Sequence, residues 1–137
     1  MKKWIACMAL AMCGCGYDNF VGTWRGSVSG WDVTVRVDRQ SDSAYSYSHS
    51  YAAVSGQIST DNSLCFTSAP MSGALYNNKD KTDVDIMSTG SGSNGAANTS
   101  IRIEGDFIGN TFLGFFTADS NYSGCKTARI PITLKRY

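Results

Sequence analysis

Hydrophobic and polar residues alternate with a period of two along much of this 137-residue chain. The pattern is clearest over residues 31–38, 101–106 and 129–135. A period of two is typical of a β-strand with one face in a core, and no segment shows the sustained spacing of three and four that indicates an amphipathic helix. These three segments are therefore predicted to be strands.

Shorter apolar segments between them predict further strands, at 20–28, 52–60, 63–67, 73–77, 83–89 and 111–117. Turn-forming pairs such as Gly109 and Asn110 separate the segments, and glycines within them indicate bends or bulges. Short strands at near-regular spacing are typical of an antiparallel barrel or sandwich. Because a closed meander leaves no sheet edge, we expect an all-β fold, a small antiparallel up-and-down β-barrel of about eight strands; a β-sandwich is the alternative.

Two segments interrupt this rhythm. Residues 90–100 are small and polar, which predicts a mobile loop. Residues 40–50 interleave serine with aromatic residues, and long loops on a rigid scaffold often carry binding residues. We interpret this segment and its surroundings as a candidate ligand- or partner-binding set, with packing on the barrel exterior as the alternative; its members are Tyr45, Tyr47, His49, Tyr51 and Tyr76.

The N-terminus has the features of a secretory signal, because Lys2 and Lys3 precede a short apolar stretch at 4–12 that cannot span a bilayer as a helix. Residues 11–15 (AMCGC) resemble a bacterial lipobox, in which a small residue precedes a cysteine that is acylated and becomes the new first residue. Cys15 fits better than Cys13, since the residue before it is glycine rather than methionine.

Acylation of Cys15 would divide the chain into a signal peptide (1–14), a short lipidated tether (15–19) and a barrel domain (20–137). The resemblance implies palmitate and related acyl chains on Cys15 and an anchored position in the membrane. Gly16, in place of an aspartate after the acylated cysteine, resembles the signal for export to the outer membrane. We therefore expect a cell-envelope protein held at the outer membrane, in the periplasmic or the surface leaflet.

Five cysteines are present, and removal of the signal and acylation of Cys15 would leave Cys65 and Cys125. In an oxidising compartment we expect these two to form one disulfide. A metal site or a cysteine nucleophile is the alternative, but there is no CxxC spacing and His49 is the single histidine. We therefore expect no metal site.

The tripeptide Gly22-Thr23-Trp24 resembles the start of lipocalin-type and avidin-type (calycin-like) barrels. That resemblance implies that Trp24 plugs one end of the barrel and that a basic residue near the chain end covers it by a cation–π contact. Arg129, Lys135 and Arg136 are available, and we expect Arg136 to make the contact. The layout of most of the chain is also similar to a loosely defined group of small bacterial outer-membrane lipoproteins of unknown function. That second resemblance implies no activity.

The remaining chemistry argues against catalysis and against nucleic-acid binding. The 12 basic and 11 acidic residues leave no positive excess to neutralise phosphates. Two carboxylate pairs, Asp83 with Asp85 and Glu104 with Asp106, share strand faces, but the sequence gives no sign of the burial that acid–base chemistry needs. Since no phosphate loop or nucleophile elbow is present, we expect neither an enzyme nor a cofactor.

These observations predict a lipid-anchored envelope protein with a non-catalytic binding or structural role, which contacts a partner protein or a small ligand through the barrel loops. One alternative is a lipocalin-like carrier of a small apolar ligand, which needs a hollow barrel. Another is an inhibitor or immunity lipoprotein directed against a toxin or a wall-degrading enzyme. A transmembrane barrel subunit is disfavoured, because the expected outward face at 32–38 is too polar for lipid.

Overall fold

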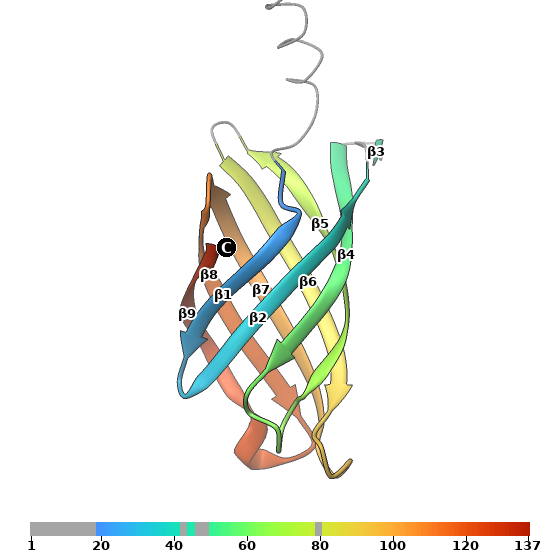
Figure 1. The fold of residues 1–137 in the computed structure, drawn as a ribbon, viewed down its shortest axis with the longest axis vertical. Helices are drawn as coiled ribbons and strands as arrows, with labels where there is room; N and C mark the ends of the chain where they lie inside the picture. The colour runs from blue at the N-terminus through green and yellow to red at the C-terminus, as the bar shows by residue number, and fades with distance from the viewer. Residues whose placement is uncertain (1–18, 42–43, 46–49, 79–80) are drawn as a thin grey trace, which may run out of the picture.

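The computed structural model describes residues 19–41, 44–45, 50–78 and 81–137 and shows a closed antiparallel β-barrel (Figure 1). The strands are β1 (Gly22–Val28), β2 (Trp31–Gln40), the two-residue β3 (Ala44–Tyr45), β4 (Ser50–Thr60), β5 (Ser68–Asn78), β6 (Lys81–Ser91), β7 (Asn98–Ile108), β8 (Thr111–Ser120) and β9 (Thr127–Arg136). A short 3-10 helix, η1 (Ser123–Cys125), precedes β9.

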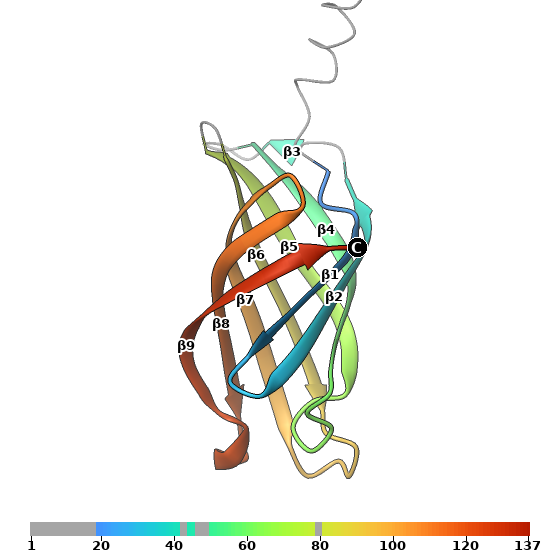
Figure 2. The same cartoon turned by 60° about the vertical axis from the view of Figure 1, so that its left-hand side comes forward.

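Eight of these strands follow one another around the barrel wall in an up-and-down order (Figures 1 and 2). The sheet closes because β1 pairs with β9, with Trp24 opposite Arg136, while β2 pairs directly with β4. The remaining strand, β3, adds only a short pairing to the start of β4. The predicted all-β barrel of about eight strands is thus confirmed, and the sandwich alternative is not what forms.

Alternation along each strand separates the inside of the barrel from the outside. In β2 the side chains of Trp31, Val33, Val35 and Val37 are buried, and those of Asp32, Arg36 and Asp38 are exposed. The three strands predicted most clearly all form, within β2, β7 and β9. Because successive side chains of a strand point to opposite faces, the apolar residues converge on one shared core inside the wall.

Glycines allow the strands to bend as tightly as an eight-strand barrel requires. A Cβ atom on Gly56 would lie 1.8 Å from the carbonyl oxygen of Arg36 on the neighbouring strand. Gly56 lies opposite Val37, where the pairing of β2 with β4 slips by one residue in a β-bulge. Such bulges and glycine bends are the means by which sheets curve enough to close.

Two sequence predictions are wrong at one end of the barrel. Residues 63–67 are a turn rather than a strand, because the amides of Cys65 and Phe66 both donate to the carbonyl of Asn62, and β5 begins at Ser68. Residues 90–100 are not one continuous loop either: β6 ends at Ser91 and β7 begins at Asn98, so the connection covers only 92–97, and Ala97 within it is buried.

The two barrel ends therefore differ. The disulfide end carries the turn at Ser29 and Gly30 and the connections at 61–67, 92–97 and 121–126 (Figures 1 and 2). The N-terminal end carries Asn19, the turn at Gly109 and Asn110, the last residues of β2 and β5, and the first residues of β4 and β6. The described part of the chain includes no helix that is long and apolar enough to cross a bilayer.

Candidate functional site

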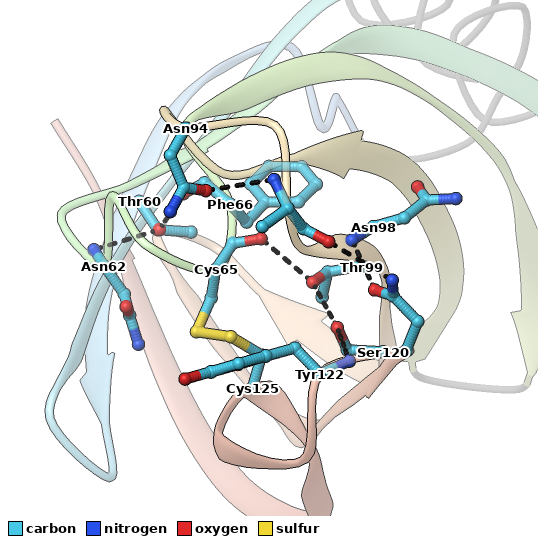
Figure 3. Close-up of a disulfide and its surroundings, with 12 residues drawn as sticks. Thr60, Asn62, Cys65, Phe66, Asn94, Asn98, Thr99, Ser120, Tyr122 and Cys125 are labelled. Atoms are coloured by element: carbon cyan, nitrogen blue, oxygen red, sulfur yellow. Dashed lines mark hydrogen bonds between the residues drawn. A yellow bond between two sulfur atoms is a disulfide. The ribbon is translucent and has the colours of Figure 1, made fainter.

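A disulfide joins two of the connections at the disulfide end. Cys65, before β5, is bonded to Cys125 in η1, with the two Cα atoms 5.3 Å apart and a sequence separation of 60 (Figure 3). Both cysteines are buried, and Phe66 beside them is completely buried. The disulfide predicted from the cysteine count is present.

Hydrogen bonds hold the connection at 92–97 and the strand that follows it to these two connections. The Thr99 hydroxyl donates to the Cys65 carbonyl at 2.9 Å and is bonded to the Ser120 hydroxyl at 3.0 Å (Figure 3). The amide of Ser93 donates to the Ser63 carbonyl at 2.7 Å. This end of the barrel is therefore a cross-linked cap in which the polar groups of the connections bond to each other.

Aromatic side chains close the interior towards the N-terminal end. The Trp24 ring is completely buried, and its ring centroid lies 4.8 Å from that of Phe20 and 5.7 Å from that of Phe107. The Trp24 indole Nε1 donates to the Phe20 carbonyl at 2.9 Å. Because β1 pairs with β9, the end of the chain passes directly over this cluster.

Arg136 lies on that cluster from the side of β9. Its guanidinium carbon is 4.5 Å from the Trp24 ring centroid, within the range of a cation–π contact. The guanidinium also donates to the carbonyls of Val21 at 3.2 Å and Gly109 at 2.9 Å. Partial burial lowers the pKa of Arg136 from its usual value. Of the three basic residues that the calycin resemblance made available, Arg136 makes the contact.

The tyrosine set lies only partly within the described residues. Tyr47 and His49 lie outside them, and of Tyr45 only the backbone, paired with Ser50 in β3, is described. Tyr51 lies directly opposite Tyr76 on the outer face of β4 and β5, with ring centroids 6.4 Å apart. The described part of the set is therefore one outward-facing pair of rings, of which Tyr76 is exposed and Tyr51 is half-buried.

The outer wall beside this pair carries the two carboxylate pairs. The register places Asp83 opposite Asp106 and Asp85 opposite Glu104, so that β6 and β7 present four carboxylates in a square. These residues line an open groove of about 340 Å³, which we call the lateral groove; its other walls are formed by Tyr76, Val84, Gly105, Phe115 and Arg129.

Two arginines compensate part of this negative charge. The Arg102 guanidinium is 2.8 Å from Asp85 and 3.5 Å from Glu104, and these carboxylates raise the pKa of Arg102, chiefly through the hydrogen bond to Asp85. Arg129 is 3.1 Å from Glu104 and lies 3.8 Å above the Phe115 ring. The side chains of both arginines remain about half exposed, so the pairs are surface pairs of small energetic value.

The groove combines paired charges with aromatic rings. The carboxylates of Asp85 and Glu104 are partly exposed, and both are paired with arginine. Among the described residues no group of three or more His, Cys, Asp or Glu side chains is placed to hold a metal ion. An exposed groove with aromatic walls and fixed charges is a surface on which a partner can dock.

Sequence reasoning missed the lateral groove as a unit. It identified the two carboxylate pairs but had no information about which strands lie side by side. Phe115 and Arg129 join the groove because β8 and β9 follow β7 in the barrel wall. The alternation within 83–85 and 104–106 showed that each carboxylate pair lies on one strand face. Only the pairing of β6 with β7 shows that the two pairs lie side by side.

A second open groove lies on the wall at the N-terminal end. It has a volume of about 550 Å³ and is lined by Val21, near the start of the described chain, and by residues 38–41 and 53–55. The Gln40 side chain accepts a hydrogen bond from the Phe20 amide at 2.8 Å and so fixes the chain entry beside this groove.

The chain was compared with protein-family models, with curated proteins and with solved structures, and none of these matches it. The closed eight-strand barrel is consistent with a calycin-like architecture.

Proposed function

We propose that this chain is a lipid-anchored cell-envelope protein that binds a partner non-catalytically with its outer surface and loops. In this proposal acylated Cys15 holds the barrel at the outer membrane, and residues 15–19 form the tether. The N-terminal sequence supports the proposal, although residues 1–18 lie outside the described part of the chain. An anchored protein meets membrane-bound partners at high local concentration, so modest affinity is sufficient.

The observation that carries a binding role on the outer surface is the packing of the interior. Every long strand contributes a large side chain that is completely buried, and these side chains form one connected core. Examples, one from each strand of the wall, are Trp24, Val35, Ile58, Leu75, Ile86, Ile103, Phe116 and Leu134. An eight-strand barrel is just wide enough for its own side chains, so a packed core competes directly with an internal ligand. This favours an external contact over the alternative of a carrier for an apolar molecule.

The lateral groove and the Tyr51–Tyr76 pair together offer a contact surface with aromatic rings and fixed charges. Tyr76 belongs to both, because its ring faces Tyr51 and also lines the groove. Tyrosine and arginine are enriched where protein interfaces gain most of their binding energy. The carboxylate square beside them favours a partner with basic groups at its contact face.

The anchor is tested by mass spectrometry of the protein purified from membranes. We expect the N-terminal peptide to begin at Cys15 and to carry acyl chains, and Cys15→Ser to release the protein from the membrane fraction. Cys13→Ser is the matched control, because Cys13 lies two residues away and would be removed with the signal. An unmodified N-terminus, or a Cys15→Ser protein that stays membrane-bound, would refute the anchor.

The binding surface is tested by affinity capture from solubilised envelopes followed by identification of the bound proteins. We expect Tyr76→Ala to lose the captured partner at least several-fold. Met87→Ala, which removes another exposed apolar side chain from the outer wall of β6, is expected to retain it. Capture of a toxin or a wall-degrading enzyme would identify an inhibitor or immunity protein. Equal capture by both variants and the wild type would refute this surface.

A further inference from the structure

We propose that the N-terminal end of the barrel rests on the lipid bilayer, with Ile108 and Leu113 as its membrane-contacting side chains. The inference rests on the proposed acylation of Cys15 and adds an orientation and a lipid-contacting surface to it. Three independent features of the described residues support it: where the chain enters the barrel, which apolar side chains are exposed there, and which charge lies beside them.

The entry point of the chain fixes which end of the barrel is near the anchor. The Phe20 ring centroid lies 4.9 Å from that of Phe107, the residue directly before Ile108. Cys15 precedes Phe20 by only five residues, so even a fully extended tether spans no more than about 17 Å. The tether would therefore attach the barrel to the bilayer at the end that carries the β7–β8 turn.

The length of the barrel keeps the opposite end away from the membrane. The wall strands have up to 11 residues, and at the usual rise and tilt such a strand extends about 28 Å along a barrel axis. With the tether attached at the N-terminal end, the disulfide end reaches the bilayer only if the barrel lies on its side (Figures 1 and 2). The short tether thus favours contact through the N-terminal end.

The side chains at that end suit a lipid interface. Ile108, the last residue of β7, is 66% exposed, and Leu113 on the outer face of β8 is 60% exposed. They are the most exposed aliphatic side chains among the large apolar residues on the described surface. Their position follows from the register, which places Ile108 opposite Thr111, two residues before Leu113.

A basic residue lies next to these two side chains, and we call Ile108, Leu113 and Lys135 the rim. Lys135 of β9 lies opposite Thr111 of β8 and donates to its hydroxyl at 2.9 Å. Since Thr111 also lies opposite Ile108, the ammonium group is close to Ile108. Aliphatic residues next to lysine are typical of surfaces that bury their apolar groups at the headgroup boundary and contact anionic lipid with the charge. Asp106, opposite Leu113, is the carboxylate that faces the rim, and it limits contact to the edge of the wall.

The orientation has a consequence for the partner. A protein that contacts Tyr51 and Tyr76 would itself have to lie close to the membrane surface, whereas the cap at the disulfide end would face away from it. The lateral groove lies on the side of the barrel, so it would be open both to membrane-bound partners and to soluble ones.

The test uses tryptophan fluorescence of the mature, acylated protein, purified from membranes and reconstituted in vesicles. The vesicles contain phosphatidylethanolamine and phosphatidylglycerol, with or without bromine atoms on the acyl chains as quenchers. Ile108→Trp places a tryptophan at the rim, and Leu113→Trp is a second, independent probe. Tyr122→Trp is the matched control, since Tyr122 is an exposed residue of the disulfide end, at 48%. Trp24 and Trp31 are buried and supply the background measured in the unsubstituted protein.

We expect brominated lipid to quench about half or more of the added emission in Ile108→Trp or Leu113→Trp and to leave Tyr122→Trp at background, because an interfacial side chain lies only about 5–10 Å deep. Anchored protein in which both rim probes are unquenched, or in which the control is quenched equally, would overturn this orientation and leave the proposed anchor intact. Protein that does not float with vesicles would instead remove the anchor, and the orientation with it.

Discussion

Removal of the Cys65–Cys125 bridge should destabilise the barrel strongly while leaving its folded structure in place. The bridge joins residues 60 positions apart, and closing a loop of that length in the unfolded chain is worth about 4 kcal/mol in the chain-entropy model. Since single domains are stable by about 5–15 kcal/mol, the Cys65→Ala/Cys125→Ala variant should lose a large share of its free energy of unfolding. For a body of about 120 residues this corresponds to a fall in Tm of roughly 15 °C.

The fold should survive because the bridge is not the sole link at that end. The Thr99 hydroxyl still bonds to the backbone of residue 65 and to Ser120, and Ser93 still bonds to Ser63. We therefore expect an unchanged far-ultraviolet circular dichroism spectrum. The urea dependence of the unfolding free energy should become steeper, because the unfolded chain expands further without the cross-link.

Urea titrations of the wild type, the double-alanine variant and Thr99→Val measure these effects. Thr99→Val is the matched control at the same end of the barrel: it should cost only about 1–2 kcal/mol, by leaving buried polar groups without a partner. A double-alanine variant within about 1 kcal/mol of the wild type would refute the reasoning, since the chain-entropy model assigns several times more to a loop of this length.

Three further predictions concern the strands. Arg136→Met should cost about 2 kcal/mol in urea unfolding, because it removes the contact with Trp24 and two hydrogen bonds to backbone carbonyls; an unchanged midpoint would mean that the guanidinium does not stabilise the barrel end. Gly56→Ala should cost more than about 3 kcal/mol or prevent folding, since its Cβ would lie 1.8 Å from a carbonyl oxygen, whereas Gly124→Ala, whose nearest neighbour is a side-chain atom 3.2 Å away, should unfold close to the wild type. Arg102→Ala should change the midpoint by less than about 1 kcal/mol, because exposed ion pairs contribute little; a larger loss, reduced by salt, would show that the arginine compensates the carboxylates of the groove.

The strands were predictable where a strand has one buried and one solvated face. At 31–38 the apolar residues are inward and the charged ones outward, so the sequence pattern and the burial pattern coincide. The pattern misled at 63–67, because Cys65 and Phe66 are apolar for another reason: they cover the barrel end and form the bridge. Periodicity reports burial, and burial at the end of a barrel does not require a strand.

Small residues misled in the opposite direction at 90–100. A Cβ atom on Gly92 would lie 1.8 Å from the Leu64 carbonyl oxygen, and Ala97 is buried. Gly92 and Ala97 are small because the two ends of the connection pack closely against their neighbours, whereas composition alone is equally typical of a mobile loop. Contacts with a segment 30 residues away in sequence decided the outcome.

The site was predictable only as fragments. Each carboxylate pair was visible within one strand, but the square they form depends on the β6–β7 register, and Phe115 and Arg129 join it through β8 and β9. The contact of Arg136 with Trp24 was predicted only from the resemblance to calycin-like barrels. The residue pattern alone could not predict it, since the two residues are 112 positions apart in the chain. Proximity that arises from barrel closure carries no signal in a single sequence.

Because the barrel is closed, side chains on the inner and outer faces of its wall contribute differently to the stability of the fold. Inward positions are occupied by side chains that contact one another, so a ligand inside would have to displace groups whose burial stabilises the fold, at about 2–5 kcal/mol for each large side chain lost. Outward positions such as Tyr76, Met87 and Leu113 are exposed and contribute little to that core. A ligand or partner that contacts them removes apolar surface from water without disturbing the core, which makes binding outside the wall the energetically favoured mode for this barrel.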